Sequence, residues 1–182
     1  METIDRSYGG AFGQAGNVSA RIRYESPPHF GPHAVHVAAW VGVSDPSGDH
    51  WLQTGLAFSA DGKKADVYVE ATDAHGHYTY RRIAAARPGR EHAFAVRRGS
   101  DGRWHAYVDG NEVGSVRIPS ASSAAAVAEA QPGGAATASY RFAFHGVRLG
   151  SGPARPSGME GARVHAHGQG AFTIGNGPAQ AS

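Results

Sequence analysis

Aromatic, amide and carboxylate side chains alternate with apolar ones along three successive runs of the chain. Successive side chains of a β-strand point to opposite faces of a sheet, so each run has one apolar face and one polar or aromatic face. The polar or aromatic face carries His36, Trp40, Trp51, Gln53, Tyr68 and Glu70. Aromatic rings stack on sugar rings and on peptide side chains, and an amide and a carboxylate supply hydrogen bonds. These residues therefore indicate a binding surface, and the alternative is a set of ordinary solvated strand positions.

The runs that position these side chains are residues 35–43, 51–58 and 66–72, and turn-forming segments separate them. The apolar residues at alternate positions of these runs predict a buried core, and aromatic residues of later strands are expected to join it. The predicted core residues are Val37, Val41, Leu52, Leu56, Val67, Val69, Phe94, Phe142 and Phe144. Trp104 is expected to pack in the core as well.

Short strands with turn residues between them fill most of the remaining sequence. They are expected at residues 18–24, 78–83, 92–98, 103–108, 113–118, 139–149, 163–167 and 171–174. This spacing predicts an all-β fold, a two-sheet antiparallel β-sandwich of jelly-roll type. We expect a flexible N-terminal arm or loosely paired edge at 1–16, a single sandwich domain at 17–175 and a flexible tail at 176–182. Within the domain, the Pro- and Gly-rich residues 150–162 are expected to form a loop.

Composition narrows the function classes. The chain has 182 residues with 17 basic and 15 acidic side chains, a net charge of +2. So balanced a charge does not favour a nucleic-acid partner. The sequence contains no Cys, which excludes disulfides and thiolate chemistry. No apolar stretch approaches the roughly 20 residues of a membrane span, so none is expected.

Two histidine pairs have the spacing that places both imidazoles on one face of a strand. They are His75 with His77, and His165 with His167. The two pairs would suit zinc or copper if they met in space. Nothing in the sequence brings them together, so we expect neither a metal site nor a cofactor.

The central runs resemble the eqolisins, the glutamic peptidases. WVGV from Trp40 and WLQTGL from Trp51 are similar to the family signature W-[VI]-G-[IV] followed by L-Q-[TA]-G-V, and ADVYVEATD from Ala65 resembles its next strand. The resemblance implies a concanavalin-like β-sandwich with a Gln/Glu dyad on its concave sheet. Gln53 then occupies the position of the dyad glutamine, and Trp40 and Glu70 match the family's accompanying Trp and Glu. A second segment, 102–116, resembles the hairpins of laminin-G-like and lectin-type sandwiches.

The dyad glutamate is where the sequence departs from the family pattern. Aligned without gaps, the family's A-E-W-I-V-E motif places its catalytic glutamate on Ala125 and its second glutamate on Glu129. Four residues span about 13 Å along a strand, so Glu129 replaces the missing carboxylate only if the register slips. The chemistry needs a carboxyl group to activate water and an amide to hold the oxyanion. Gln53 alone donates a hydrogen bond but takes no proton.

Three functions remain open at this point. The favoured one is a non-catalytic, peptidase-like or lectin-like sandwich, a pseudoenzyme that binds a polysaccharide or an extended peptide on its concave face. The second is an acid-active glutamic endopeptidase that uses Gln53 with a rearranged glutamate such as Glu129. The third is a structural, self-assembling subunit that forms a homo-oligomer through strand edges or the N-terminal arm. The resemblance implies a secreted or cell-surface protein, but the N-terminus has no apolar signal core, so a cytoplasmic location stays open.

Overall fold

The computed structural model describes residues 7–30, 34–59, 64–132, 139–150, 152–154, 156–159, 162–168 and 170–176. Within these residues every regular element is a β-strand. No described segment forms a helix that is long and apolar enough to cross a membrane.

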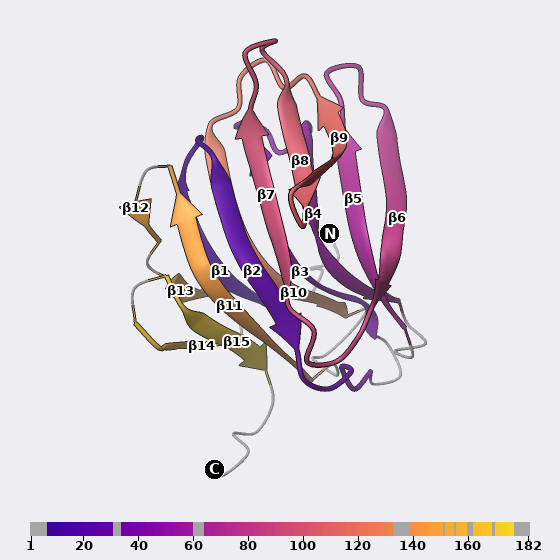
Figure 1. The fold of residues 1–182 in the computed structure, drawn as a ribbon, viewed down its shortest axis with the longest axis vertical. Coiled ribbons are helices and arrows are strands. Elements are labelled where there is room, and N and C mark those ends of the chain that lie inside the picture. The colour runs from indigo at the N-terminus through magenta and orange to yellow at the C-terminus, as the bar shows by residue number, and fades with distance from the viewer. Residues whose placement is uncertain are drawn as a thin grey trace, which may run out of the picture.

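Two antiparallel sheets lie face to face (Figure 1). The strands of the first sheet are β1 (Ser7–Gln14), β3 (Ala34–Ser44), β4 (Trp51–Ser59), β5 (Ala65–Thr72), β6 (Tyr78–Ala86), β10 (Ser123–Pro132) and β13 (Pro156–Met159). Their order in this seven-stranded sheet is β13-β1-β10-β3-β4-β5-β6. The predicted all-β, two-sheet sandwich is therefore confirmed.

The second sheet is built from β2 (Val18–Tyr24), β7 (His92–Arg98), β8 (Trp104–Val108), β9 (Asn111–Val116), β11 (Tyr140–Leu149), β14 (Arg163–Ala166) and β15 (Phe172–Asn176). The order of this eight-stranded sheet is β14-β15-β11-β2-β7-β8-β9, and the short β12 (Gly152–Pro153) pairs with β11. In Figure 1 the strands β2, β7 and β8 lie in front, and β3, β4 and β10 lie behind them.

The core lies between the sheets, and the sequence located it correctly. All the predicted core residues are at most 6% exposed, and Trp104 is 3% exposed. Aromatic rings from both sheets meet there, with Phe58 of β4 at a ring-centroid distance of 6.3 Å from Phe142 of β11. The alternation of the opening runs therefore turns one face of β3, β4 and β5 inward and leaves the other free for a site.

Two expectations for the chain ends and loops need correction. Residues 7–14 of the expected flexible arm form β1, which pairs with β10 on one side and β13 on the other. Ala11 of this strand is fully buried, so burial of a small apolar side chain holds the strand in the sheet. The expected loop at 150–162 contains β12 and β13, and Ala154 between them is only 7% exposed. The rest of the arm, residues 1–6, and the tail beyond 176 lie outside the described residues.

Candidate functional site

A single row of residues crosses five strands on the outer face of the seven-stranded sheet. The register pairs Ala125 of β10 with Gly42 of β3, Gly42 with Gln53 of β4, Gln53 with Glu70 of β5, and Glu70 with Tyr80 of β6. Directly paired residues of an antiparallel sheet point to the same side. We call this side of β10, β3, β4, β5 and β6 the Gln53 face.

Gln53 is held by two hydrogen bonds from its own amide nitrogen. Gln53 Nε2 donates to Glu70 Oε1 at 2.6 Å and to the Tyr68 hydroxyl at 3.1 Å. Glu70 Oε2 in turn accepts a hydrogen bond from the Tyr78 hydroxyl at 2.9 Å. Both protons of the amide nitrogen are therefore used inside the protein, so the group that would hold an oxyanion is occupied. The predicted placement of Gln53 and Glu70 on one face is confirmed by this contact.

Tyr68 is fully buried although it lies on the Gln53 face, which corrects its expected place on the predicted binding surface. Its ring packs with Ala38, Ala57 and Trp40 in a small apolar cluster separate from the main core. The ring of Tyr80 stacks on it, with centroids 5.5 Å apart and planes 15° from parallel. Small neighbours let the larger rings close over Tyr68, so only Trp40 and Trp51 of the expected aromatic residues keep partial exposure.

Gly55 sits between Trp40 and Tyr68 in the register of β3, β4 and β5. A Cβ atom added to Gly55 would lie 2.1 Å from the Ala39 carbonyl oxygen and 2.8 Å from Trp40 Cβ. Side-chain contacts that close do not occur in folded proteins, so the strands would have to move apart. The glycine therefore allows the close approach on which the aromatic cluster depends.

Glu129 is also on this face but does not reach Gln53. Its Oε1 accepts a hydrogen bond from Trp40 Nε1 at 3.1 Å. The register places Glu129 opposite Ala38, four residues along β10 from the Ala125 position that shares a row with Gln53. The carboxylate that reaches Gln53 is that of Glu70. The candidate catalytic pair Gln53 and Glu129 is thus not brought together.

The charges of the face are set by burial. Desolvation raises the pKa of the Glu70 carboxyl, the Tyr78 bond opposes this, and the nearby Glu129 charge adds to the rise. Burial also raises the pKa of Tyr78 to about 12 and carries that of Tyr68 well above its usual range. Desolvation lowers the pKa of His36, with the Glu129 carboxylate acting in the opposite direction. The neutral forms of Glu70 and His36 are therefore favoured relative to the same groups in water.

The structure adds three aromatic residues that sequence reasoning did not include in the site. Tyr78 and Tyr80 of the edge strand β6 are 60% and 44% exposed, and the Tyr78 ring lies 6.1 Å from that of Trp51. Phe12 of β1 is 43% exposed and pairs with Ala125, so it extends the row at the other side. The sequence carried a usable signal, because Tyr78 and Tyr80 are two residues apart on one expected strand and therefore point to the same face.

The histidine pairs occupy separate places. His75 and His77 lie in the turn before β6, where Asp73 Oδ1 accepts hydrogen bonds from both of their backbone N–H groups. His165 lies on β14, and His167 Nε2 contacts the Thr173 hydroxyl at 2.7 Å. Among the described residues, no group of three or more His, Asp or Glu side chains is arranged to hold a metal ion.

Comparison with known proteins shows what this chain is similar to. Scytalidoglutamic peptidase, solved with a peptide-based transition-state analogue, superposes with a TM-score of 0.67 at 17% identity, over 94% of this chain and 98% of that one. The eqolisin SCP-B, solved with the tripeptide Ala-Ile-His, superposes with a TM-score of 0.62 at 18% identity, over 94% and 98% of the two chains. No family model and no curated protein matches the sequence. The fold is therefore that of the eqolisin peptidases.

Proposed function

We propose that the Gln53 face binds an extended peptide and does not cleave it. The observation that carries the proposal is the row of residues through Gln53. In this row the methyl group of Ala125 lies where peptide hydrolysis by a Gln/Glu dyad would need a carboxylate. Ala125 lies two strands from Gln53, about 10 Å at the usual strand spacing, with only Gly42 between them. A general base at Ala125 would share the space above Gly42 with the Gln53 side chain. Without it, nothing on β10 takes a proton from water beside Gln53.

The surfaces around this row suit a peptide. Ala125 and Gly42 leave a low strip on the sheet, bordered by the exposed ring of Phe12 on one side and the partly exposed rings of Trp51 and Tyr78 on the other. Aromatic borders of this kind accept apolar peptide side chains. Two structures of the same fold, scytalidoglutamic peptidase and SCP-B, contain a peptide-based analogue and a tripeptide, which favours a peptide over a polysaccharide.

A binding experiment with an unfolded peptide tests the proposal. Oxidised insulin B chain is titrated into the protein while tryptophan fluorescence and titration heat are followed. We expect saturable binding by the wild type and loss of binding in Trp51→Ala. Tyr107→Ala, an aromatic truncation on the other sheet, is the matched control and should bind as the wild type does. Binding of soluble neutral glucans in place of the peptide would reject the peptide, and a fall in molecular mass in Trp51→Ala would show that the face is an assembly contact.

A second candidate function rests on the Gln53–Glu70 contact. Glu70 is a carboxyl with a raised pKa, 2.6 Å from the Gln53 amide, so a water held between the ligand and these two groups would lie beside a carboxyl group able to exchange a proton with it. Against it, Glu70 Oε1 and Oε2 are already engaged by Gln53 and Tyr78. Acid peptidase activity with Glu70 as the rearranged glutamate is therefore the alternative.

Cleavage assays separate the two functions. Between about pH 2 and pH 5, where a protonatable glutamic dyad would work, we expect no cleavage of denatured protein by the wild type. Cleavage by the wild type that disappears in both Gln53→Ala and Glu70→Gln would establish the peptidase. Cleavage by Ala125→Glu alone would support the pseudoenzyme, because that substitution restores a carboxylate in the row of Gln53.

A further inference from the structure

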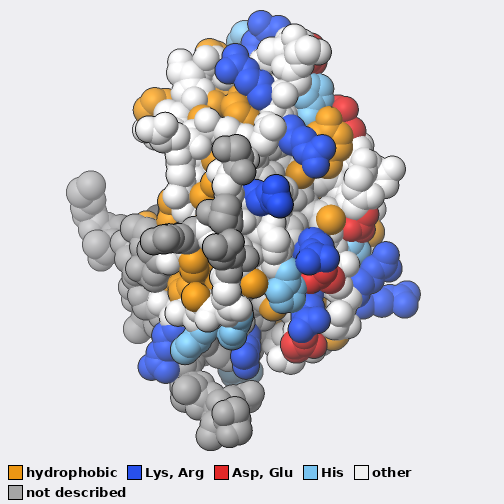
Figure 2. All heavy atoms as spheres, turned by 60° about the vertical axis from the view of Figure 1, so that its left-hand side comes forward, with side chains coloured by type: hydrophobic (Ala, Val, Ile, Leu, Met, Phe, Trp, Pro, Cys, Tyr) orange, Lys and Arg blue, Asp and Glu red, His pale blue; other side chains and the backbone are white. Residues whose placement is uncertain are grey.

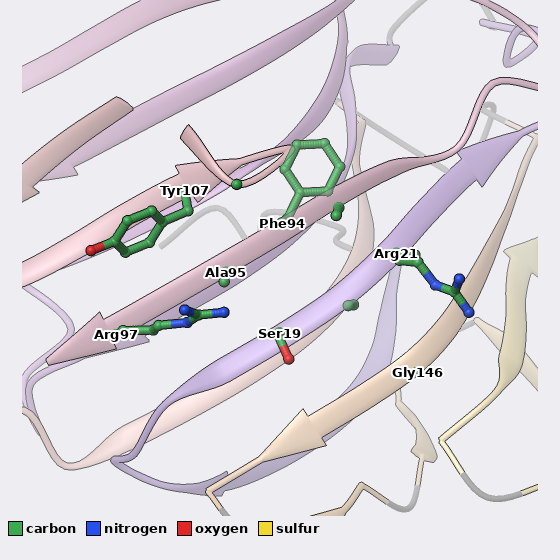
Figure 3. A pocket seen from close by; sticks show the side chains of 10 residues that line it. Ser19, Arg21, Phe94, Ala95, Arg97, Tyr107 and Gly146 are labelled. Atoms are coloured by element: carbon green, nitrogen blue, oxygen red, sulfur yellow. The ribbon is translucent and has the colours of Figure 1, made fainter. Parts of the chain in front are cut away.

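The outer face of the eight-stranded sheet contains a groove of about 380 Å³, on the opposite side of the molecule from the Gln53 face. Ser19 of β2 and Ala95 of β7 pair in register and form part of its floor. Arg21 stands at one side, and Arg97 and Tyr107 stand at the other. Figure 3 shows Ser19 between the two arginine side chains, with Arg97 lying toward the ring of Tyr107.

Arg97 is a groove-lining cation without an acidic partner among the described residues. Its guanidinium carbon lies 5.4 Å from the centre of the Tyr107 ring. The Arg97 side chain forms no ion pair with any residue that the structure describes. Arg148 of β11 is exposed and pairs in register with Ser19, so a further guanidinium group borders the same floor. Arg21 has a partner, Glu91, at 3.4 Å, and its side chain is still 60% exposed.

The carboxylates near the groove already contact basic side chains. Glu91 contacts Arg21 and His145. Glu112 pairs in register with Tyr107 and accepts from His105 Nδ1 at 3.0 Å, while His105 Nε2 lies 3.0 Å from Asp101. On the face shown in Figure 2, the blue groups are separated by white, pale blue and red groups and form no continuous basic field. The free positive charge is therefore local, and it suits a small anionic group better than a long polyanion that needs many contacts.

The floor of the groove restricts how a ligand is recognised. β2, β7 and β8 are interior strands whose backbone N–H and C=O groups are used in the sheet on both sides. A peptide backbone would find no strand edge to pair with here. The ligand is therefore recognised by side chains: the guanidinium groups, the Ser19 hydroxyl, and the side of the groove formed by Tyr107 and Arg97.

We propose that this groove binds an anionic sugar residue, a uronic acid or a sulfated pyranose. The Arg97 guanidinium binds the carboxylate or sulfate, because this planar group can donate two parallel hydrogen bonds to either anion. The apolar face of the pyranose packs against the Tyr107 ring, and the Ser19 hydroxyl bonds a sugar hydroxyl. Arg21 and Arg148 add positive charge at the two ends of the ligand. The groove is independent of the peptide site on the other sheet.

Titration calorimetry with defined sugars tests this site. The probes are trigalacturonate and a heparin-derived disaccharide, with fully methyl-esterified trigalacturonate and inorganic sulfate as comparisons. We expect both anionic sugars to bind, the ester not to bind, and Arg97→Gln to weaken binding by about tenfold or more. Arg117→Gln, which removes the same charge from an exposed residue outside the groove, should leave the affinity unchanged. Backbone amide signals of Ser19 and Ala95 should shift on binding to the wild type.

Each of the other possible titration results either supports or overturns the proposed sugar site. Absence of binding by both anionic sugars, or equal affinities of Arg97→Gln and Arg117→Gln, would overturn the proposal. Equal affinity for inorganic sulfate and the sulfated disaccharide would reject the sugar and leave an anion site. A preference for trigalacturonate or for the disaccharide assigns the anion as carboxylate or sulfate. Arg97→Lys keeps the charge without the planar fork and should bind with intermediate affinity; unchanged urea midpoints confirm that the variants are folded.

Discussion

The two sheets present outer faces of opposite character. On the Gln53 face, Tyr68 is buried as completely as a core residue, and an amide, a carboxyl and hydroxyl groups bond to one another beside it. On the outer face of the eight-stranded sheet, charged side chains stand in pairs such as His105 with Asp101, over a floor of small residues. Both faces are built from alternating strands with the same kind of inner face.

The difference shows that the alternation of apolar and polar residues determines which side of a strand faces the core. It does not determine how far the other side is shielded from water. Gly42 on β3 and Gly55 on β4 leave no side chains in the middle of the Gln53 face, so rings from neighbouring strands meet there. On the outer face of the opposite sheet, the small residue Ala95 has Arg97 and Arg21 beside it. The charges of these side chains keep that surface hydrated. On the Gln53 face desolvation raises the pKa values of Glu70 and Tyr68, whereas the hydrated face leaves charge available to a ligand.

The largest effect that separates the faces is expected from truncating one tyrosine on each. Tyr68→Ala removes a fully buried ring and the acceptor of the Gln53 bond, so we expect a loss of about 3–5 kcal/mol in the free energy of unfolding. Tyr107→Ala, at a partly exposed ring, should cost about 1 kcal/mol or less. Urea unfolding measures both. Similar losses for the two variants would mean that the Gln53 face is no drier than the other.

A smaller effect is expected from adding one methyl group. Gly55→Ala places a Cβ against the Ala39 carbonyl and Trp40, and should cost about 1–3 kcal/mol as the strands separate. Gly114→Ala on β9 is the matched control, because its Cβ would meet Val69 at an ordinary 3.4 Å. The unfolding midpoints of the two variants are compared with the wild type. A harmless Gly55→Ala would contradict the close packing of Trp40 over the sheet.

Sequence reasoning identified most of the fold and the row that contains Gln53. Period-2 alternation sufficed for the inner faces, and the shared non-core parity of Gln53 in WLQTGL and Glu70 in ADVYVEATD sufficed to place the two on one side. β1 was missed because the Gly-rich segment around Ala11 has no apolar alternation, although pairing on both sides stabilises it. The burial of Tyr68 was missed because it depends on which residues stand beside it on other strands. That information is in the register, which a single sequence does not state.

The pH dependence of stability should have opposite signs on the two faces. The raised pKa of Glu70 means that the folded state holds its proton more tightly than the unfolded state, whose ordinary value is 4.5. Its stabilising contribution is therefore full below that value and is lost as pH rises through the raised pKa. The pKa of Asp101 is lowered, chiefly by the His105 hydrogen bond, so its contribution is present above the ordinary 3.8 and is lost as pH falls through the lowered value.

Urea unfolding of variants between about pH 3 and pH 6 measures both slopes, in a range where the raised pKa of His105 keeps that side chain protonated. Glu70→Gln should flatten the decline of stability with rising pH. Asp101→Asn should be destabilising at the upper end of the range and approach the wild type at the lower end. Slopes of the same sign for the two differences would contradict the assignment of a desolvated and a hydrated face.

The smallest effect is expected from an exposed ion pair on each face. Arg82 Nε lies 2.6 Å from Asp66 Oδ1 at the β6 edge of the Gln53 face, and the two side chains are 53% and 30% exposed. Arg21 Nε lies 3.4 Å from Glu91 Oε1 on the other face, with exposures of 60% and 28%. Because water screens both pairs, Arg82→Gln and Arg21→Gln should each cost about 0.5 kcal/mol or less, and 1 M salt should remove the difference. A loss of about 2 kcal/mol in Arg82→Gln that persists in salt would show that the desolvated network around Tyr68 extends to the edge strand β6, which would move the boundary between the two environments outward.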